Sequence, residues 1–296
     1  MLKKIKNAGL KEKTLRINIS PEVEIFSKII TSGSKEGKTG LYIHGGAFTG
    51  NHTMIERPAK WLVAKGLFNK MILIDRRGDG FSSRLNREFT IFRESEDLKI
   101  LLDKLNIDEK IIVIGNSYGG PIALLLSKID ERVEKVILSV SSPTLMHSFF
   151  PLQILFKLRI LKPLIKFFAF IFTGLKKSQF TDLDFMYDLK YSIQYHKVFT
   201  STLAHSPRKE LKNIFLKIDS IFSNYNLGLP KDIIFEVPVL QVIGSKDEFW
   251  GREFPEDYRN NFPKLKRISL EGKKHKDAFV NAELFHKSMI DFIENG

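Results

Sequence analysis

One serine of this chain lies in a setting that would expose it as a nucleophile. The segment IIVIGNSYGGPIALLL, residues 111 to 126, predicts a buried strand, a sharp turn that carries Ser117, and an apolar helix. Gly115, Gly119 and Gly120 leave room for the close approach of strand and helix that such a turn requires. A serine in this G-x-S-x-G turn, called a nucleophile elbow, is placed to attack a carbonyl carbon. Ser117 is therefore the candidate nucleophile.

A serine nucleophile needs a base, and the base needs an acid that orients it. Asp247 follows an apolar strand predicted from Val237 to Ile243, and His275 follows a shorter strand that ends near Leu270. The chain order is Ser, Asp, His, and both later residues come directly after a late strand. We therefore predict Asp247 as the acid and His275 as the base, with Glu248 as the fallback acid.

The alternatives for these two residues are simple. Asp247 would be a solvated turn residue in SKDE, and His275 would be one more polar residue in the basic run GKKHK. Of the seven histidines, His275 alone sits between a late strand and the predicted terminal helix, residues 278 to 294. His286 is predicted to lie on the surface of that helix.

The segment LYIHGGAFTG, residues 41 to 50, predicts an apolar strand that runs into a loop of small residues. Small residues let backbone N–H groups face a negative charge that develops on a substrate oxygen. We predict that the backbone N–H groups of Gly46 and Tyr118 form such an oxyanion hole. His44 and Gly45 are predicted to shape the loop and not to act in catalysis; the alternative is a plain turn after a strand.

Taken together, these motifs resemble the α/β-hydrolase superfamily. The segment ILIDRRGDGFSS, residues 72 to 83, is similar to that family's D-x-R-G-x-G-x-S loop after the fourth strand. The resemblance covers nearly the whole chain. It implies an α/β fold with a mostly parallel central sheet flanked by helices, and an inserted, mainly helical cap. The implied core is 1–143 and 232–296, and the implied cap is 144–231, where no specific residue carries over.

Helical patterns agree with this alternation of strands and helices. They are predicted near residues 52–66, 90–105, 118–129 and 278–294. In the second of these, the apolar residues share one face: Ile91, Leu98, Leu101, Leu102 and Leu105.

The resemblance implies a serine hydrolase that is similar to esterases and lysophospholipases with a cap. His275 would accept the proton of Ser117 as its oxygen attacks an acyl carbonyl, while Asp247 would hold the imidazole. Water would then resolve the acyl-enzyme to a carboxylic acid and an alcohol, without any cofactor. The expected substrate is an apolar ester.

Other chemistries of the same fold stay open at this point. A serine at the elbow argues against haloalkane dehalogenases and epoxide hydrolases, which need a carboxylate there. Proline iminopeptidases share the HGG start but continue with Pro and Gly, where this chain has Ala47 and Phe48. Acyl transfer, C–C bond hydrolysis, aminopeptidase action and cofactor-free peroxidation remain alternatives. So does a small-molecule receptor that keeps the triad but lacks brisk turnover.

Composition limits the partners. A chain of 296 residues with 43% hydrophobic content suits one core with an inserted cap, and its lack of cysteine excludes disulfides and thiolate zinc sites. No spacing of His, Asp and Glu suggests a metal site. The net charge of +13 comes from scattered lysines, so we expect no nucleic-acid partner. The basic N-terminal residues lack the apolar stretch of a secretory signal, and a cytoplasmic location is expected.

One segment of the predicted cap, residues 147 to 177, is rich in Phe, Leu and Ile and carries six Lys or Arg but no acidic residue. Its recurring charges are too frequent for a bilayer span. It predicts either an interfacial helix in peripheral contact with an anionic membrane or apolar side chains that pack the cap and line an acyl pocket. Both interpretations favour an apolar substrate, while acyl length and oligomeric state stay open.

Overall fold

The computed structural model describes residues 9–33, 37–46, 50–87, 89–143, 163, 211–220, 229–247, 254–280 and 282–295. The candidate site residues lie within these ranges: Gly46, Ser117, Tyr118, Asp247 and His275. The fallback acid Glu248 and most of the predicted cap, 144–231, lie outside the described residues.

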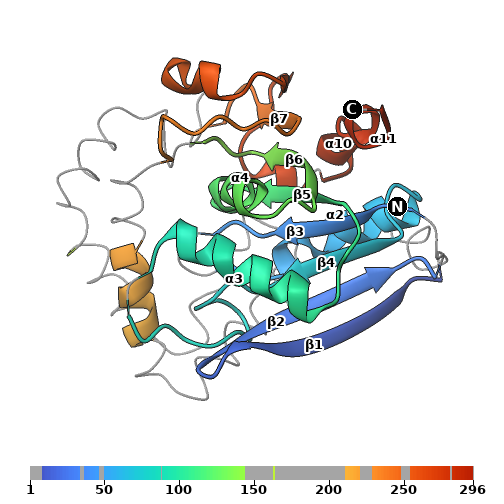
Figure 1. The fold of residues 1–296 in the computed structure, drawn as a ribbon. Coiled ribbons are helices and arrows are strands. Elements are labelled where there is room, and N and C mark those ends of the chain that lie inside the picture. The colour runs from blue at the N-terminus through green and yellow to red at the C-terminus, as the bar shows by residue number, and fades with distance from the viewer. Residues whose placement is uncertain are drawn as a thin grey trace, which may run out of the picture.

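Strands and helices alternate from residue 39 to residue 139, as Figure 1 shows. The strands are β1 (Lys11–Ser20), β2 (Val23–Thr31), β3 (Thr39–Ile43), β4 (Lys70–Ile74), β5 (Ile111–Asn116), β6 (Val133–Ser139), β7 (Val239–Gly244) and β8 (Leu265–Leu270). The helices are α2 (Thr53–Ala64), α3 (Ile91–Lys104), α4 (Gly119–Ile129), the 3-10 helix η2 (Glu256–Asn261), α9 (Asp277–Val280), α10 (Ala282–Lys287) and α11 (Ile290–Asn295). Residues 211–220 are also helical.

The described strands form one sheet in the order β1-β2-β4-β3-β5-β6-β7-β8. The strands from β4 across to β8 pair in parallel, while β2 runs antiparallel to both of its neighbours. Every residue of β5 and β7 is buried, which suits apolar strands that are covered on both faces. The predicted mostly parallel central sheet with flanking helices is confirmed.

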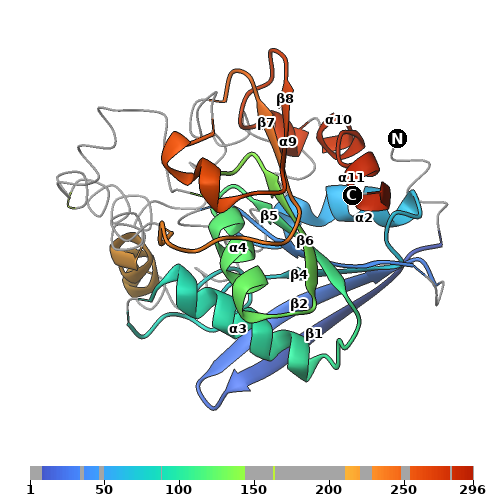
Figure 2. The ribbon, with the colours of Figure 1, turned by 45° about the horizontal axis from the view of Figure 1, so that its top comes forward.

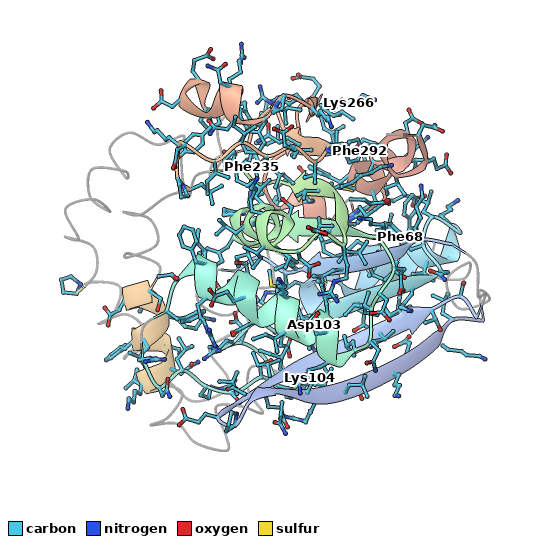
Figure 3. The ribbon with its side chains drawn as sticks, viewed as in Figure 1. Phe68, Asp103, Lys104, Phe235, Lys266 and Phe292 are labelled. Atoms are coloured by element: carbon cyan, nitrogen blue, oxygen red, sulfur yellow. The ribbon has the colours of Figure 1, made fainter. Side chains whose placement is uncertain are left out.

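Two layers of helices cover the sheet. Figures 1 and 2 show α3 and α4 on one face, and α2 with the C-terminal helices α10 and α11 on the other. Each layer packs on its own cluster of buried apolar side chains. In Figure 3, Phe68 and Phe292 belong to the cluster beneath α2 and α11, whereas Asp103 and Lys104 lie on the exposed side of α3.

Helix α3 follows its predicted pattern. The hydroxyl of Thr90 accepts a hydrogen bond from the backbone N–H of Arg93 at 3.3 Å, which satisfies one of the free donors of the first turn. The predicted apolar face is buried against the sheet, with Leu105 partly buried at the C-terminal end. Thus α3 contributes one continuous side of the core.

The C-terminal region differs from its prediction. The sequence predicts one helix over 278–294, but the chain forms α9, α10 and α11, with a turn at Ser288 and Met289 between α10 and α11. Phe285, Met289 and Ile293 all belong to the apolar cluster under α2. The predicted surface position of His286 is wrong, because its ring is fully buried and its Nε2 lies 2.8 Å from the hydroxyl of Tyr42 on β3.

The close packing of β5 against α4 can be tested at Gly115. A Cβ there would lie 2.6 Å from the carbonyl oxygen of Gly119 and from Cα of Gly120, both rigid backbone atoms. Gly115→Ala should lower the free energy of unfolding in urea by about 3 kcal/mol. Gly272→Ala is the control: its φ is +69° and nothing lies within 4 Å, so only about 1 kcal/mol of backbone strain is expected. Equal losses for the two variants would contradict the steric argument.

Candidate active site

Ser117 occupies a strained turn between β5 and α4. Its φ of 49° lies in the left-handed region that side chains other than glycine rarely adopt. Its backbone N–H donates to the carbonyl of Ser139 at 2.9 Å, and its carbonyl accepts from the hydroxyl of Ser141 at 2.5 Å and from the N–H of Gly120 at 3.0 Å. These bonds hold the residue in a conformation that would otherwise relax.

The glycines around this turn allow three segments of backbone to meet. A Cβ at Gly119 would lie 2.6 Å from the carbonyl oxygen of Ile43, and a Cβ at Gly45 would lie 2.8 Å from Cβ of Ser117. The loop after β3 therefore packs directly against the serine turn. The structure brings Gly46 and Tyr118, the two predicted oxyanion donors, to adjoining loops beside Ser117.

The sheet topology explains why the other candidates approach the same edge. The chain leaves β3 through α2 to β4 on one side, and then returns through α3 to β5 on the other side of β3. Ligand sites of α/β sheets form at the carboxyl ends of the strands where the strand order reverses. Ser117 follows β5 there, while Asp247 and His275 follow the parallel strands β7 and β8.

Asp247 and His275 form a hydrogen-bonded pair. His275 Nδ1 lies 3.0 Å from Asp247 Oδ2, and both side chains are buried, with exposed fractions of 5% for Asp247 and 9% for His275. A carboxylate can only accept, so Nδ1 carries the hydrogen, and in the neutral ring Nε2 is then the nitrogen with the lone pair. An imidazole of this tautomer, held by an acid, has the form that a general base requires.

Backbone contacts fix the two loops that carry this pair. The N–H of Ser245 donates to the carbonyl of Leu270 at 2.9 Å, and the N–H of Lys246 donates to the carbonyl of Lys273 at 2.9 Å. A Cβ at Gly244 would lie 2.1 Å from that same Lys273 oxygen, so only glycine permits the approach. The Asp247 and His275 loops are thereby joined by two backbone hydrogen bonds.

His44 organises the loop after β3. Its Nε2 accepts the backbone N–H of Arg76 at 3.2 Å, so the hydrogen is on Nδ1, which donates to the carbonyl of Gly45 at 2.6 Å. Burial lowers the pKa of His44 well below its usual range, and the charge of Arg76 adds to the effect. A neutral histidine with both nitrogens engaged fits the predicted loop-shaping role and not catalysis.

A buried charged cluster that the sequence analysis did not predict lies beside this loop. Arg76 forms ion pairs with Asp79 at 2.8 Å and with Glu94 at 3.2 Å, and Asp79 also pairs with Lys217 of the helical residues 211–220. Together with Tyr118, these four side chains line a small pocket. One signal was present in the sequence: Glu94 lies on the same helical face as the apolar Ile91 and Leu98, where a charge needs a buried partner.

Helical residues 211–220, the main described part of the predicted cap, are bound to the core. The amide of Asn213 donates to the carbonyl of Gly78 at 2.8 Å and accepts from the N–H of Leu85 at 2.9 Å. The hydroxyl of Ser220 accepts from the N–H of Phe89 at 3.0 Å. In Figures 1 and 2 this helix lies beside the start of α3, at the edge where the candidate site is built.

Within the described residues, no group of three or more His, Asp or Glu side chains is arranged to hold a metal ion. Among the helices of the described part, none is long and apolar enough to cross a membrane.

Comparison with known proteins identifies the family. The family model described as the alpha/beta hydrolase fold matches residues 41–282, which is most of the chain and includes the whole candidate site. The chain belongs to the α/β-hydrolase fold family. No curated protein matches this α/β-hydrolase in sequence.

Solved structures share the fold of this α/β-hydrolase at low sequence identity. The 2-hydroxy-6-oxo-6-phenylhexa-2,4-dienoate hydrolase from Rhodococcus sp. strain RHA1 is 16% identical with a TM-score of 0.70, covering 97% of this chain and 100% of that chain. A thermophilic esterase from Thermogutta terrifontis is 17% identical with a TM-score of 0.65, covering 95% and 98%. An enol-lactonase from Burkholderia xenovorans LB400 is 15% identical with a TM-score of 0.64, covering 94% and 99%.

The buried cluster of this α/β-hydrolase gives a prediction about pH and stability. Burial raises the pKa of Glu94 to about 7 from its ordinary 4.5, against the opposing charge of Arg76. Between these values the folded protein keeps a proton that the unfolded chain releases. The contribution to stability is therefore full below pH 4.5 and is lost as the pH rises through 7. In the wild type, the free energy of unfolding in urea should fall by roughly 1–3 kcal/mol between pH 5 and 8. Glu94→Gln should remove this fall.

The matched control is Glu96→Gln on the same helix, because Glu96 is exposed and pairs only with Arg93 among the described residues. This variant should keep the pH dependence of the wild type. If Glu94→Gln also keeps it, Glu94 is not the group whose burial causes the fall.

Proposed function

We propose that this protein is a serine hydrolase that cleaves carboxylic esters of apolar or lipid-like substrates through an acyl-enzyme. The observation that carries the proposal is the hydrogen bond between Asp247 and His275, at the sheet edge where Ser117 sits in a strained turn. A buried acid that holds a histidine at the carboxyl ends of parallel strands, near a serine with positive φ, suits nucleophilic catalysis. Family membership supports a hydrolase.

The proposed reaction has two halves. In the first, Ser117 Oγ attacks the acyl carbonyl and its proton passes to His275 Nε2, while Asp247 stabilises the imidazolium. The alkoxide leaving group takes that proton and departs as an alcohol. In the second half, water gives a proton to His275 and attacks the acyl-enzyme, releasing the carboxylic acid and restoring Ser117. The N–H groups of Gly46 and Tyr118 bind the oxyanion in both halves.

The substrate class rests on sequence composition and on the fold neighbours. The apolar segment 147–177 would supply a hydrophobic acyl site. The neighbours named above include an esterase and an enol-lactonase, whose names describe attack on an ester carbonyl. The same segment, which carries six basic and no acidic residues, would also suit contact with an anionic membrane.

C–C bond hydrolysis is the second candidate. The Rhodococcus neighbour, whose name describes a dienoate hydrolase, shares the fold of this chain with a TM-score of 0.70. The same nucleophile and base could act on an activated ketone, with a carbon leaving group taking the proton in place of an alkoxide. Turnover of a dienoate without turnover of any ester would favour this candidate.

The nucleophile can be tested with p-nitrophenyl esters from acetate to palmitate. Ser117→Ala should lower kcat/KM by at least about 10³-fold, because the attacking oxygen is lost while the fold is kept. Ser127→Ala on α4 is the control and should turn over esters like the wild type. Undiminished hydrolysis by folded Ser117→Ala protein would refute the assignment of this serine.

The same ester series, repeated with anionic lipid vesicles, separates the two roles of segment 147–177. A Ser117-dependent rate that rises with chain length and rises further with vesicles would support an interfacial enzyme. A rate that rises with chain length but does not change when vesicles are added would indicate that this segment covers an acyl pocket.

The acid can be tested by Asp247→Asn. An amide at this position can donate to Nδ1 and would favour the tautomer that lacks a lone pair on Nε2. We expect kcat to fall by about 10⁴-fold with little change in KM. Glu248→Gln is the control and should remain active. Loss of activity in Glu248→Gln, with Asp247→Asn active, would move the acid role to Glu248.

A further inference from the structure

Arg76 occupies an unusual position in the structure. It stands at the place that the D-x-R-G-x-G-x-S pattern leaves open, since Arg77 is the arginine of that pattern. Its exposed fraction is only 4%, although it carries a full positive charge. Its guanidinium forms ion pairs with Asp79 through Nη2 and with Glu94 through Nη1. Two further contacts of this guanidinium with described residues are with the proposed oxyanion hole.

The first of these contacts is with Gly46. Arg76 Nη2 donates to the carbonyl oxygen of Gly46 at 2.7 Å, and the preceding carbonyl, that of Gly45, is held by His44 Nδ1 at 2.6 Å. The two peptide planes on either side of Gly46 are thus both fixed. Gly46 has a φ of +78° and no side chain, so without these bonds its peptides could rotate freely. The Gly46 N–H shares its peptide plane with the Gly45 carbonyl, so the bond from His44 sets its direction, because a trans peptide points N–H and C=O oppositely. The bond from Arg76 fixes the next plane and so keeps the rest of Gly46 from moving that N–H away.

The second contact is with Tyr118. The guanidinium carbon of Arg76 lies 4.6 Å from the centroid of the Tyr118 ring, a cation–π distance in a buried setting. Tyr118 directly follows Ser117 and precedes the first residue of α4. One guanidinium therefore contacts both residues whose N–H groups form the proposed oxyanion hole. The backbone N–H of Arg76 also donates to His44 Nε2, which adds a third link to the loop after β3.

We propose that Arg76 is a positioning residue, which holds Gly46 and Tyr118 so that their N–H groups point at the developing oxyanion. The inference rests on the proposed serine chemistry and adds a residue to it. An oxyanion hole works because its donors are oriented before the charge appears. A purely structural ion pair would affect stability alone, whereas a positioning residue also affects the rate at which Ser117 reacts.

Arg77 provides a matched control. Its guanidinium binds Asp97 through Nε and Nη2, both at 2.7 Å, so it is also an arginine fork on a buried acid. It is the next residue in the same loop, but its fork is directed to α3 and not to the loop after β3. Arg76→Lys and Arg77→Lys each keep the charge and lose the planar fork. Both variants should lower Tm.

The experiment measures the rate at which a fluorophosphonate labels Ser117. In this reaction Ser117 Oγ bonds to phosphorus, fluoride leaves, the proton passes to His275, and the phosphonyl oxygen occupies the oxyanion hole. The probe needs no knowledge of the natural substrate. For Arg76→Lys the second-order rate constant should fall at least tenfold, but by no more than the roughly 10²–10³-fold that complete loss of one donor costs. Arg77→Lys should label within twofold of the wild type.

A second readout is the separate measurement of kcat and KM for hydrolysis of p-nitrophenyl acetate. For Arg76→Lys, kcat should fall in proportion to the labelling rate and KM should change by less than threefold. If Arg76→Lys does not fold cooperatively, Glu94→Gln takes its place. This variant keeps Gly46 and Asp79 on the guanidinium but replaces the charged acceptor of Nη1 by a neutral amide oxygen. Its labelling should slow by two- to tenfold above pH 8, where Glu94 of the wild type is ionised.

The outcomes separate this inference from the proposed function. Wild-type protein that labels at Ser117, with Arg76→Lys or its replacement equally fast, would overturn the positioning role and leave the serine chemistry standing. Equal slowing of Arg76→Lys and Arg77→Lys would also overturn it, because the effect would then follow stability. Wild-type protein that shows no Ser117-dependent labelling would overturn both proposals.

Discussion

The backbone of Ser117, held at a φ of 49°, is the constraint on which the rest of the site depends. Such a conformation costs about 1–2 kcal/mol for a residue with a side chain. The cost is offset because the N–H and carbonyl of this residue are tied to β6 and to the segment that follows it. The turn also requires that α4 begin almost in contact with β5, which only glycine at 115 permits. The loop after β3 must then pass within van der Waals distance of the serine, so its glycines follow from the same constraint.

Much of this arrangement could be predicted from the sequence, because it depends on local pattern and on the chain order of the strands. A buried apolar strand, a glycine turn and an apolar helix specify the position of Ser117, and the carboxyl ends of later parallel strands specify those of Asp247 and His275. The charged cluster could not be predicted in the same way. Its ion pairs join Arg76 to a helix that begins fifteen residues later, and Asp79 to Lys217 far along the chain. Arginine and lysine in a sequence are typical of the surface, and only folding reveals which of them are buried.

The buried cluster has a physical role that its energy alone does not explain. Taking charges out of water is unfavourable, and well-packed apolar residues would often be as stable. Lys217 shows the conflict directly, since burial lowers its pKa while the neighbouring Asp79 raises it. What the charges provide is direction: a guanidinium offers planar donors at fixed angles, whereas apolar side chains would leave a carbonyl such as that of Gly46 without a donor. Because Lys217 belongs to the helical residues 211–220, the same cluster joins that segment to the loop beside the nucleophile.

Two histidines of the site illustrate how environment assigns a role to an identical side chain. His44 is fully buried, its pKa is lowered, and both ring nitrogens are used by backbone groups, so it has no lone pair to offer a substrate. His275 has one nitrogen on a carboxylate, which fixes the tautomer and leaves Nε2 as the basic atom. The difference lies in the partner of Nδ1: a carbonyl in one ring and a carboxylate in the other. A carboxylate stabilises an imidazolium and a carbonyl in a buried loop does so far less, so of these two rings His275 is the one that suits the proposed proton transfer.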